Sequence, residues 1–597
     1  MIYNLIRTKG NAGEQIAGFG GLNRTDNTEK NEFADMINLS SDKYPFLTPS
    51  RAAKNALENN ISGIRAVIAP QYSSNADIEG FTGVAKGGKA NTRTKNKFYY
   101  NGREIDFADN ENMSIPDVDV TLADFNGRII ICYYGLVKDE NGRDKETHDM
   151  YYYDYTATGD GTVKKMEKGF SGKNVITCTA YSSGNPNTDF SVINYLYSSG
   201  ITWPFKEGDS VFIEGFQNIE NNTIHLDSRY QDVSPTRAIS CIVEKVEKDK
   251  LYLQMYNRNG NALVFKNESN KSGVSVYTKI PTMNHVCIHN NRLWGTNPNG
   301  EYIYASKQGD CFNFNTFQGL ANDSFYAEIG TAGGFAGIVS FRDTLVAFKR
   351  DYIHHVYGDK PANFTIPKQL SDCGCIDIRS AAQVGTTMYF LGYDGIYAYV
   401  GGQPTLISKK LDRKYKSAVA MTDGQKYIVS CKGDKGNELF VLDTEHGLWH
   451  MEDYIDAVDS FRWHDKLYIA TADKVYEYGA LSFNDSEYKQ EDEKEYNWAC
   501  ESVIIHDDTF DNKGVTELWI RARIDEGSEI KVLTSEDGGV FLDRGTLKGM
   551  GTLKVYRIPI RFINGEFYQY RLEGTGNAVI YSIERVLSLG GRQYRSI

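Results

Sequence analysis

The sequence lacks any apolar stretch that approaches the roughly 20 residues of a membrane-spanning helix. Its first ten residues contain an apolar run too short for the core of a signal peptide, and no small-residue cleavage pattern follows. We therefore expect no membrane anchor, no classical export, and synthesis in a cytoplasm.

Framework cysteines and an excess of positive charge are also missing. The nine cysteines are an odd number and are scattered without the spacing of a disulfide framework, so we expect reduced thiols, most of them buried. The 66 Lys and Arg are outnumbered by 78 Asp and Glu, which gives a formal net charge of -12. This charge opposes tight, non-specific nucleic-acid binding because such binding needs cations to neutralise phosphates.

Proline is scarce, with 13 residues, whereas tyrosine and glycine are abundant, with 40 and 56 residues. Aromatic residues favour half-buried strands and glycine favours tight turns, so the composition predicts an all-β protein with few helices. A hairpin pattern then recurs: a partly alternating run, a polar turn and a mostly apolar run. Its six copies begin at Val120, His285, Gly337, Ala381, Ala418 and Ala457.

Each hairpin is followed by a turn and a further aromatic or apolar strand, so each repeat contains three or four antiparallel strands. From Leu293 to Leu467, the first apolar residues after the turns lie 39 to 52 residues apart. This spacing is typical of four-stranded propeller blades, which take about 40 to 50 residues. With further strands expected at 64–68 and 98–107, the sequence predicts a β-propeller of six or seven blades.

Two additional β domains interrupt and follow the repeats. The step from Ile129 to Leu293 exceeds the other steps between repeats by more than a hundred residues, which indicates an insertion. Alternating segments in this insertion suit a small β-barrel. Alternating segments beyond the last repeat predict a β-sandwich. The expected organisation is an N-terminal arm with a lead-in segment at 1–60, propeller at 61–171, inserted β-barrel at 172–280, propeller at 281–480, charged linker at 481–496 and β-sandwich at 497–597.

Motifs that commonly carry catalysis or metal binding are absent or incomplete. The sequence has no Gly-Lys-Ser/Thr phosphate loop, no Gly-x-Ser-x-Gly elbow and no His-Glu-x-x-His pattern. His354 and His355 are adjacent on an expected strand, so their side chains point to opposite faces and cannot chelate one metal together. Cys373-Gly-Cys375 lacks the gap and the second ligand pair of a zinc site. We therefore predict no metal or redox site.

Three further segments favour structural interpretations. Residues 535–541 partly resemble the Asp-box turn of sialidase-like propellers, but the motif occurs once and outside the repeats. Residues 507–514 depart from a calcium loop at two required positions. Asp117 and Asp119 are paired carboxylates that we expect in solvent at the beginning of a strand. The sequence thus predicts no catalytic residue, no cofactor and no enzymatic activity.

The loop at 86–97 is the one cationic cluster in this acidic chain. We interpret it as a solvated loop. Contact with a phosphate backbone or with an acidic neighbouring subunit is the alternative.

Two passages resemble the propeller-containing tail nozzle or hub proteins of tailed bacteriophages, a group that includes the packaged-DNA stabilisation proteins of short-tailed phages. The first combines Phe-Gly-Gly-Leu-Asn at 19–23 with 31–40 and 44–51, and is similar to the segment that leads into the first blade. The second combines 291–296 with 302–314 and is similar to a recurring blade of phage structural propellers. The likeness extends over residues 1 to 480 and rests on the pattern of the blades.

This resemblance implies a virion structural protein that is made in the cytoplasm of the bacterial host. It implies a ring of identical subunits, commonly six, below the portal and adaptor of the tail, in contact with other tail proteins. Genomic DNA is held by such a ring and crosses its lumen during ejection. A net acidic wall would repel phosphates and let the DNA slide.

Two other functions stay open on the sequence. The protein could be a glycan-binding propeller in which exposed aromatic residues, such as Trp203 or Trp449, stack on cell-surface sugars. It could also be a glycoside hydrolase, which would need two carboxylates roughly 5 to 10 Å apart, contributed by different blades.

Overall fold

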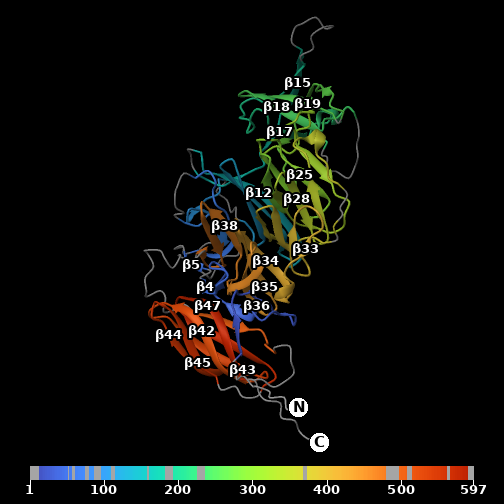
Figure 1. The fold of residues 1–597 in the computed structure, drawn as a ribbon. Helices are drawn as coiled ribbons and strands as arrows, with labels where there is room; N and C mark the ends of the chain where they lie inside the picture. Colours follow the sequence, from blue (N-terminus) through green and yellow to red (C-terminus); the bar gives the residue numbers. More distant parts are fainter. Residues whose placement is uncertain are drawn as a thin grey trace, which may run out of the picture. The chain divides into compact units, whose positions relative to one another are not determined.

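The computed structural model describes residues 12–50, 53–56, 61–73, 80–86, 96–108, 115–157, 161–181, 192–224, 235–257, 259–367, 371, 373–478, 497–506, 514–560 and 565–588. These residues form strands and three one-turn 3-10 helices, η1 (Ile219–Asn221), η2 (Pro361–Asn363) and η3 (Lys409–Leu411). The chain divides into two compact units, residues 58–378 and residues 1–57 with 379–597. The all-β prediction is confirmed (Figure 1).

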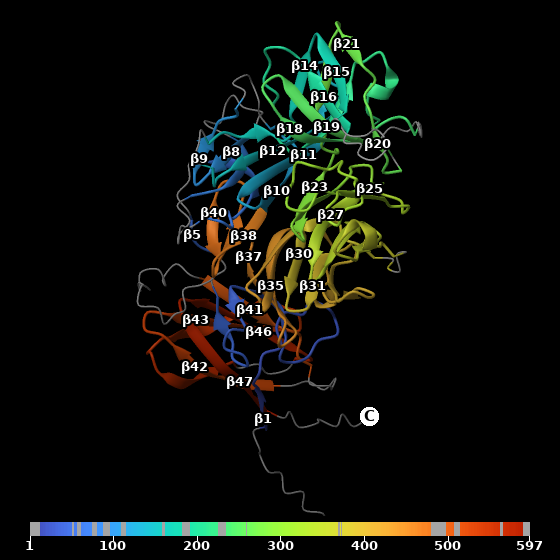
Figure 2. The same ribbon diagram turned by 90° about the horizontal axis from the view of Figure 1, so that it is seen from above.

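Seven antiparallel sheets follow one another along the described chain and are the blades of the predicted propeller. Four belong to the unit at 58–378, where β10, β11 and β12 can be followed side by side (Figure 2). Their strands are β6 (Ser62–Val67), β7 (Gly83–Lys86), β8 (Asn96–Tyr100) and β9 (Arg103–Ile105); β10 (Asp119–Phe125), β11 (Arg128–Lys138), β12 (Asp144–Asp154) and β13 (Lys164–Lys165); β23 (His285–His289), β24 (Arg292–Thr296), β25 (Tyr302–Ala305) and β26 (Phe325–Glu328); and β27 (Phe335–Phe341), β28 (Thr344–Lys349) and β29 (Ile353–Val356).

The remaining three blades belong to the other unit, whose boundary falls at the start of β30. Their strands are β30 (Asp377–Val384), β31 (Thr387–Leu391), β32 (Ile396–Tyr399) and β33 (Thr405–Leu406); β34 (Tyr415–Thr422), β35 (Lys426–Gly433), β36 (Gly436–Asp443) and β37 (Leu448–Asp453); and β38 (Asp459–Trp463), β39 (Lys466–Ala470), β40 (Val475–Tyr478) and β5 (Ala53–Ala56). Successive blades within a unit touch through their first strands, as β10 does with β6 and β34 with β38.

The first hairpin of a blade forms where two turn residues separate two apolar runs. Asn126 and Gly127 join β10 to β11 with φ of 52° and 84°, and Asn290 and Asn291 join β23 to β24 with φ of 49° and 54°. Two consecutive positive φ angles are the geometry of the tight hairpin turn whose twist matches that of the strands. Asparagine and glycine tolerate this region best, so the local sequence is sufficient to specify these hairpins.

The apolar run of β11 is continuous rather than alternating because both faces of its sheet are covered. Ile129 and Ile131 belong to a core shared with the first blade, whereas Ile130 and Cys132 belong to a core shared with the third. All four side chains are 0% exposed. A strand buried on both faces needs apolar residues at every position, and this is how blades stack.

The seventh blade takes its fourth strand from the beginning of the chain. β5 pairs with β40, so that strands more than four hundred residues apart share one sheet. The next strand along the chain, β6, opens the first blade. This pairing is not visible in the repeat pattern, which counts only neighbouring strands.

The insertion contains nine strands in one sheet, ordered β14-β22-β17-β18-β19-β16-β15-β21 with β20 beside β19. Its buried core includes Val175, Val211, Val243, Leu253 and Val276. Among the described residues no pairing joins the end strands β14 and β21, so closure of the expected barrel is not seen. The strands are β14 (Gly169–Gly172), β15 (Val175–Tyr181), β16 (Val192–Tyr197), β17 (Ser210–Glu214), β18 (Ser240–Val246), β19 (Lys250–Tyr256), β20 (Ala262–Leu263), β21 (Glu268–Asn270) and β22 (Val274–Tyr277).

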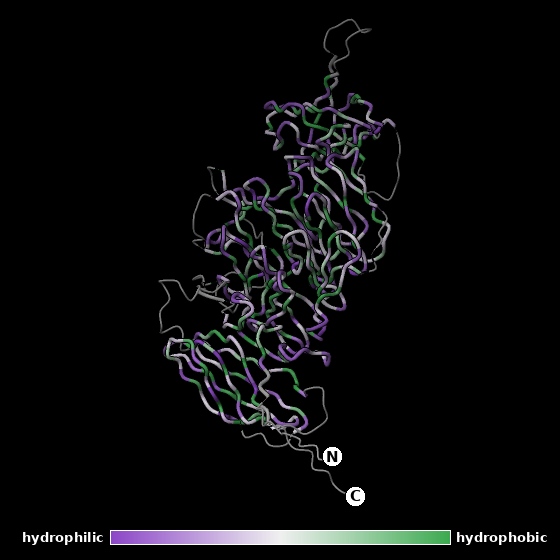
Figure 3. Tube along the Cα trace, viewed as in Figure 1, coloured by the Kyte–Doolittle hydropathy of each residue, from purple (hydrophilic) through white to green (hydrophobic). Residues whose placement is uncertain are grey.

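The C-terminal sandwich consists of two sheets, ordered β1-β47-β42-β45 and β2-β41-β46-β43-β44. Figure 3 shows hydrophobic and hydrophilic positions alternating along its strands, as the alternating burial of β46 requires. The N-terminal arm supplies β1 to one sheet and β2 to the other. The strands are β1 (Ala12–Ile16), β2 (Phe33–Ile37), β41 (Asn497–Ser502), β42 (Gly514–Ile524), β43 (Glu529–Glu536), β44 (Leu542–Lys548), β45 (Leu553–Pro559), β46 (Tyr568–Thr575) and β47 (Ala578–Ser588).

The arm also lies against the sixth blade, formed by β34 to β37. The backbone N–H of Leu22 donates to the carbonyl of Trp449 over 2.6 Å. Gly21 precedes this contact with φ of +81°, and a Cβ there would stand 2.6 Å from the Trp449 carbonyl oxygen. Only glycine allows so close an approach, which explains this glycine of the Phe-Gly-Gly-Leu-Asn sequence. A short hairpin, β3 (Leu39–Ser40) with β4 (Thr48–Pro49), follows in the arm.

Ion pairs around two buried carboxylates complete this contact. We call the residues that form them the polar clasp: Arg24 and Glu32 of the arm with Lys410, Arg413 and Glu438. Lys410 Nζ lies 2.7 Å from Glu32 Oε1, and Arg24 lies 3.0 Å from Glu438 Oε1. Arg413 also pairs with Glu438. The Glu32 and Glu438 side chains are only 3% and 7% exposed, and such buried charges are tolerated because each is paired.

Candidate functional site

The adjacent histidines occupy opposite faces of β29, as the sequence predicts. His354 Nε2 lies 2.8 Å from the Thr331 hydroxyl, and His355 Nδ1 lies 3.2 Å from the Thr344 hydroxyl. Burial, with the charges of Lys349 and His355, lowers the pKa of His354 to about 4. Each histidine thus has a separate polar partner, and His354 is neutral near pH 7.

The cysteines form no site that the structure describes. All nine lie among the described residues and none is in a disulfide. The Cys375 Sγ donates to the Asp377 carbonyl over 3.1 Å. No group of three or more His, Cys, Asp or Glu side chains that could hold a metal occurs among the described residues.

Asp117 and Asp119 are exposed, as expected, but Asp117 also pairs with two cations of the first blade. Its carboxylate contacts Arg65 and lies 2.8 Å from Lys86 Nζ. Burial opposes ionisation, but Lys86 and Arg65 outweigh it and hold the pKa of Asp117 below its usual value. Asp117 therefore ties the segment before β10 to β6 and β7, which is a structural role. Lys97, the last residue of the basic loop, pairs with Glu104 over 3.1 Å.

The segment at 535–541 forms the turn between β43 and β44. The Ser535 hydroxyl donates to the Gly539 carbonyl over 2.6 Å, and Asp537 Oδ1 accepts from the backbone N–H of Glu566 and Phe567. These contacts hold a hairpin. Two other predictions lie outside the described residues, namely the turn at 507–514, of which only Gly514 is described, and the linker at 481–496, as do residues 87–95 of the basic loop.

The two tryptophans proposed for sugar stacking are buried, which corrects that expectation. Trp203 is 4% exposed and packs against Phe170 at 4.6 Å between ring centroids. Trp449 is 2% exposed, and its indole N–H donates to the Ile407 carbonyl. Both rings are part of buried cores, where a large apolar ring gains most by burial, and the indole N–H of Trp449 is also satisfied there.

An exposed apolar surface lies instead on the sandwich, at the last strand of each sheet. Among the described residues β44 pairs only with β43, and β45 pairs only with β42. The strands β44 and β45 contact each other (Figure 1). We call residues 540–559, which comprise these two strands and the residues that join and flank them, the open edge. Five apolar side chains here are 41% to 78% exposed, namely Val540, Leu542, Met550, Leu553 and Val555.

The open edge is also cationic. Its two strands contain Arg544, Lys548, Lys554 and Arg557 against the single carboxylate of Asp543. The Arg557 guanidinium lies over the Trp519 ring, 4.3 Å from its centroid, and this contact fixes the charge on the outer face of β45. The open edge thus combines exposed apolar area with positive charge in a chain whose net charge is -12.

Comparison with known proteins gives no family. No family model matches the chain, and no curated protein matches it at the significance required. The solved structures that align with it include the exo-beta-1,3-galactanase of Phanerochaete chrysosporium, at 8% identity over 50% of this chain and 95% of that chain, with a TM-score of 0.19.

BamB of Moraxella catarrhalis aligns at 10% identity over 43% of this chain and 83% of that chain, with a TM-score of 0.22. Hsv2 of Kluyveromyces lactis aligns at 10% identity over 56% of this chain and 96% of that chain, with a TM-score of 0.20. These values transfer no activity, ligand or partner. Within the described residues no helix is long and apolar enough to cross a bilayer. The fold is a β-propeller with an inserted β domain and a C-terminal β-sandwich.

Proposed function

We propose that this protein is a non-catalytic structural subunit that assembles with further copies of itself through the open edge of its sandwich. The supporting observation is the exposed, apolar and cationic pair of terminal strands. A soluble protein normally covers or blunts such strands, because unpaired backbone groups beside apolar side chains bind other chains. Here the apolar residues would form the centre of an interface and the charged residues its rim.

The charges of the open edge favour one kind of assembly. Two copies of the same cationic edge repel each other, so a two-fold contact between identical edges is disfavoured. Residues 1–496 contain 53 Lys and Arg against 64 Asp and Glu, whereas residues 497–597 are nearly balanced at 13 against 14. The acidic part of the next copy is the complementary partner. A contact between different surfaces of identical chains generates a closed ring or an open filament.

A ring agrees with the likeness of the 19–23, 31–40 and 44–51 segments to tail nozzle and hub proteins of bacteriophages. In this proposal the chain is one subunit of a six-fold ring in the virion tail, in contact with the portal, the adaptor and other tail proteins. The ring holds packaged DNA and conducts it during ejection. The N-terminal arm supports such a mechanical role, because its strands join both sheets of the sandwich and the polar clasp ties it to a blade.

Imaging tests the proposal. Negative-stain micrographs of the purified chain at rising concentration, and of particles that contain it, should show closed rings. The Val555→Glu variant places a carboxylate in the apolar centre of the open edge and should abolish them. Val400→Glu is the matched control, because Val400 is 56% exposed in another part of the chain. Rings that persist in Val555→Glu, or two-fold dimers in place of rings, would contradict the proposed interface.

Salt provides an independent measurement. Raising the ionic strength from about 0.1 M to about 1 M shortens the screening length from about 10 Å to about 3 Å. Sedimentation velocity should then show weaker assembly, because a cationic edge on an acidic surface loses attraction. Assembly that strengthens with salt would indicate a purely apolar contact.

A further inference from the structure

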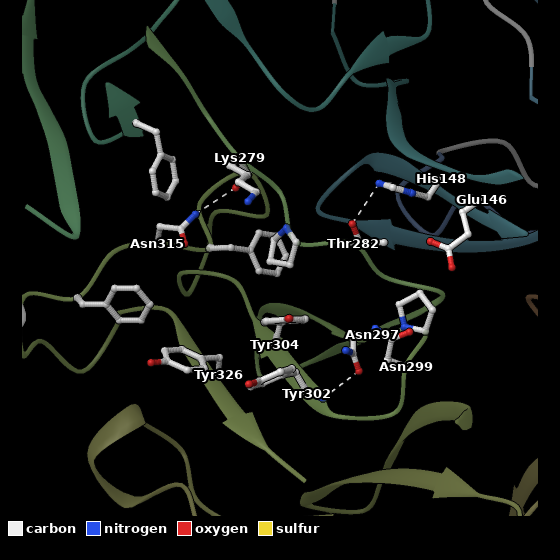
Figure 4. Close-up of a pocket in the computed structure, with 15 residues that line it drawn as sticks. Glu146, His148, Lys279, Thr282, Asn297, Asn299, Tyr302, Tyr304, Asn315 and Tyr326 are labelled. Carbon is white, nitrogen blue, oxygen red and sulfur yellow. Dashed lines mark hydrogen bonds between the residues drawn. The ribbon is translucent and has the colours of Figure 1, made fainter. Parts of the chain in front are cut away.

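A cavity of about 240 Å³ opens where the insertion joins the propeller, within the unit at 58–378 (Figure 4). Its wall comes from β12 of the second blade, from β25, β26 and the segments on either side of β25 in the third, from Phe212 of β17 in the insertion, and from the segment that returns from the insertion, which includes Lys279 and Thr282. The cavity is smaller than the roughly 300–1,000 Å³ of pockets that take drug-sized ligands. Its volume suits one ring-sized group.

Three tyrosines of the third blade form one side of the cavity. Ile303 and Ala305 are 0% exposed and fix the inward face of β25, so Tyr302 and Tyr304 project from the opposite face. Their rings are stacked with centroids 6.0 Å apart, and Tyr304 is paired in register with Tyr326 of β26. Tyr326 is 40% exposed and makes an edge contact with Phe317. Aromatic faces are thus held in place by the strands that carry them.

Amide and hydroxyl groups surround the tyrosines. Asn297 Oδ1 accepts from the backbone N–H of Glu301 and of Tyr302, over 2.7 and 2.8 Å, and so fixes the turn that leads into β25. Asn315 donates to the Lys279 carbonyl over 3.1 Å. Across the cavity wall, His148 Nε2 lies 3.1 Å from the Thr282 hydroxyl. The wall is therefore preorganised by its own hydrogen bonds, as a binding site requires.

We propose that this cavity binds a neutral pyranose residue of a saccharide, with one face of the sugar stacked on the tyrosines and its hydroxyl rim directed to the amides. A pyranose presents apolar C–H groups on its faces and donors and acceptors around its edge. Tyrosine combines a large apolar ring with a polar tip, and asparagine both donates and accepts. The two sets of groups in the wall match these two features of a sugar.

The charges of the wall argue against an anionic ligand. Lys279 is the single Lys or Arg among the lining residues, and Glu146 is the single carboxylate. A nucleotide or a phosphorylated ligand would call for clustered cations. Cleavage of a glycosidic bond would call for two carboxylates. The lining residues therefore suit a site that holds a sugar without hydrolysing it.

This inference is independent of ring assembly and adds a ligand to the proposed structural role. A saccharide site beside the insertion would let the protein bind polysaccharide at a cell surface. One small cavity that contacts one sugar residue implies a weak individual site, with a dissociation constant in the millimolar range. Repetition of the site in a multisubunit assembly would multiply the avidity.

Saturation-transfer difference NMR with methyl glycosides of glucose, galactose, mannose, rhamnose and N-acetylglucosamine tests the site. We expect at least one glycoside to receive saturation, most strongly at the ring protons of one face, because these would lie against the tyrosines. The Tyr326→Ala variant should weaken binding about tenfold, the effect of losing one aromatic stack. Tyr326→Phe should keep most of it.

Tyr357→Ala is the matched control, because Tyr357 is also 40% exposed but lies outside the cavity. Asn299→Ala alters the exposed turn of the wall and gives a second variant in case Tyr326→Ala fails to fold. Measuring binding in the Val555→Glu background separates this inference from ring assembly. The inference is overturned if none of the five glycosides receives saturation, or if Tyr357→Ala reduces binding as much as Tyr326→Ala and Asn299→Ala.

Discussion

The polar clasp and the open edge both involve charged residues around a sheet, but they differ in what covers them. In the clasp every carboxylate is buried against cations of the same chain, and the Glu438 side chain is 7% exposed. At the open edge the apolar residues are exposed, and Val555 is 41% exposed. The clasp is thus completed within one chain, whereas the open edge offers the same kinds of contact to a second one. A charge that is buried against its own chain stabilises the fold, whereas a charge at an exposed edge can select a partner.

Removing the centre of the clasp should have the largest effect on this contrast. Glu438→Ala leaves Arg24 and Arg413 without their shared carboxylate, and Tyr415 loses the oxygen that its hydroxyl contacts at 3.1 Å. Breaking a buried pair in this way costs about 3–5 kcal/mol. Urea unfolding should show that loss.

Asp434→Ala is the control for that variant. Asp434 pairs with Lys416 in the same blade, but the two side chains are 83% and 73% exposed. Its loss should leave the free energy of unfolding nearly unchanged, because exposed ion pairs contribute little. Equal losses in the two variants would show that the clasp is no stronger than a surface pair.

Closing the space at Gly21 should have the next largest effect. Gly21→Ala combines a positive φ with a Cβ 2.6 Å from the Trp449 carbonyl oxygen, whereas Gly447→Ala in the same blade has φ of +67° and nothing within 4 Å of its Cβ. We expect Gly447→Ala to lose about 1 kcal/mol through backbone strain. Gly21→Ala should lose about 2–3 kcal/mol more, because its Cβ also collides with the Trp449 carbonyl. Thermal unfolding of the two variants measures the difference. Equal losses in the two variants would show that the arm can shift away from Trp449 with no cost in free energy.

A smaller and pH-dependent effect is expected at Asp443, which accepts from the Ser41 hydroxyl of the arm over 2.6 Å. Burial opposes its ionisation, but hydrogen bonds from Ser41 and His446 outweigh it and lower the pKa of Asp443 below its usual value. A carboxyl whose pKa is lower in the folded state contributes stability above its unfolded pKa and loses it as pH falls through the folded pKa.

Asp443→Asn should therefore be less stable than the parent at pH 7, and the difference should shrink below a pH of about 4, where the parent also becomes protonated. Urea midpoints across that range measure the convergence. Asp465→Asn is the control, because the Asp465 side chain is fully exposed in a turn of the seventh blade. A constant difference between parent and Asp443→Asn at all pH values would exclude the electrostatic origin.

The smallest change in stability is expected at the open edge itself. Val555→Glu replaces an exposed side chain and should alter the free energy of unfolding by less than about 0.5 kcal/mol, even though it should abolish assembly. Urea unfolding at a concentration that favours the monomer measures this. A loss as large as that of Glu438→Ala would place Val555 in the core of its own chain.

The sequence was informative where structure is local. The hairpins at Asn126 and at Asn290 follow from adjacent turn residues, and the repeat spacing then predicts the blades. It could not show that β1, β2 and β5 leave the N-terminal arm to complete distant sheets, because strand pairing across hundreds of residues has no local signal. Closure of the inserted barrel was expected from alternation alone, and alternation does not specify which strands meet.

The surfaces were harder to predict than the fold. Trp203 and Trp449 were expected on the surface, yet both rings are buried, because burial is decided by neighbours that are remote in the chain. The sugar-sized cavity gathers Glu146, Thr282 and Tyr326 from three separate elements. One signal was available: tyrosines at 302 and 304 alternate with apolar residues, which predicts an exposed aromatic face on that strand.

Because β5 pairs with β40, the seventh blade cannot be completed until late in the synthesis of the chain. Residues 53–56 leave the ribosome long before residues 475–478, with which they share the seventh blade. At about 5–20 residues per second, the early strand waits for about 20 to 85 seconds without its partner. During that interval it is a bare strand among many nascent strands of similar pattern. Slower or interrupted translation should therefore lower the yield of correctly folded protein, and co-expressed chaperones that shield such strands should restore it.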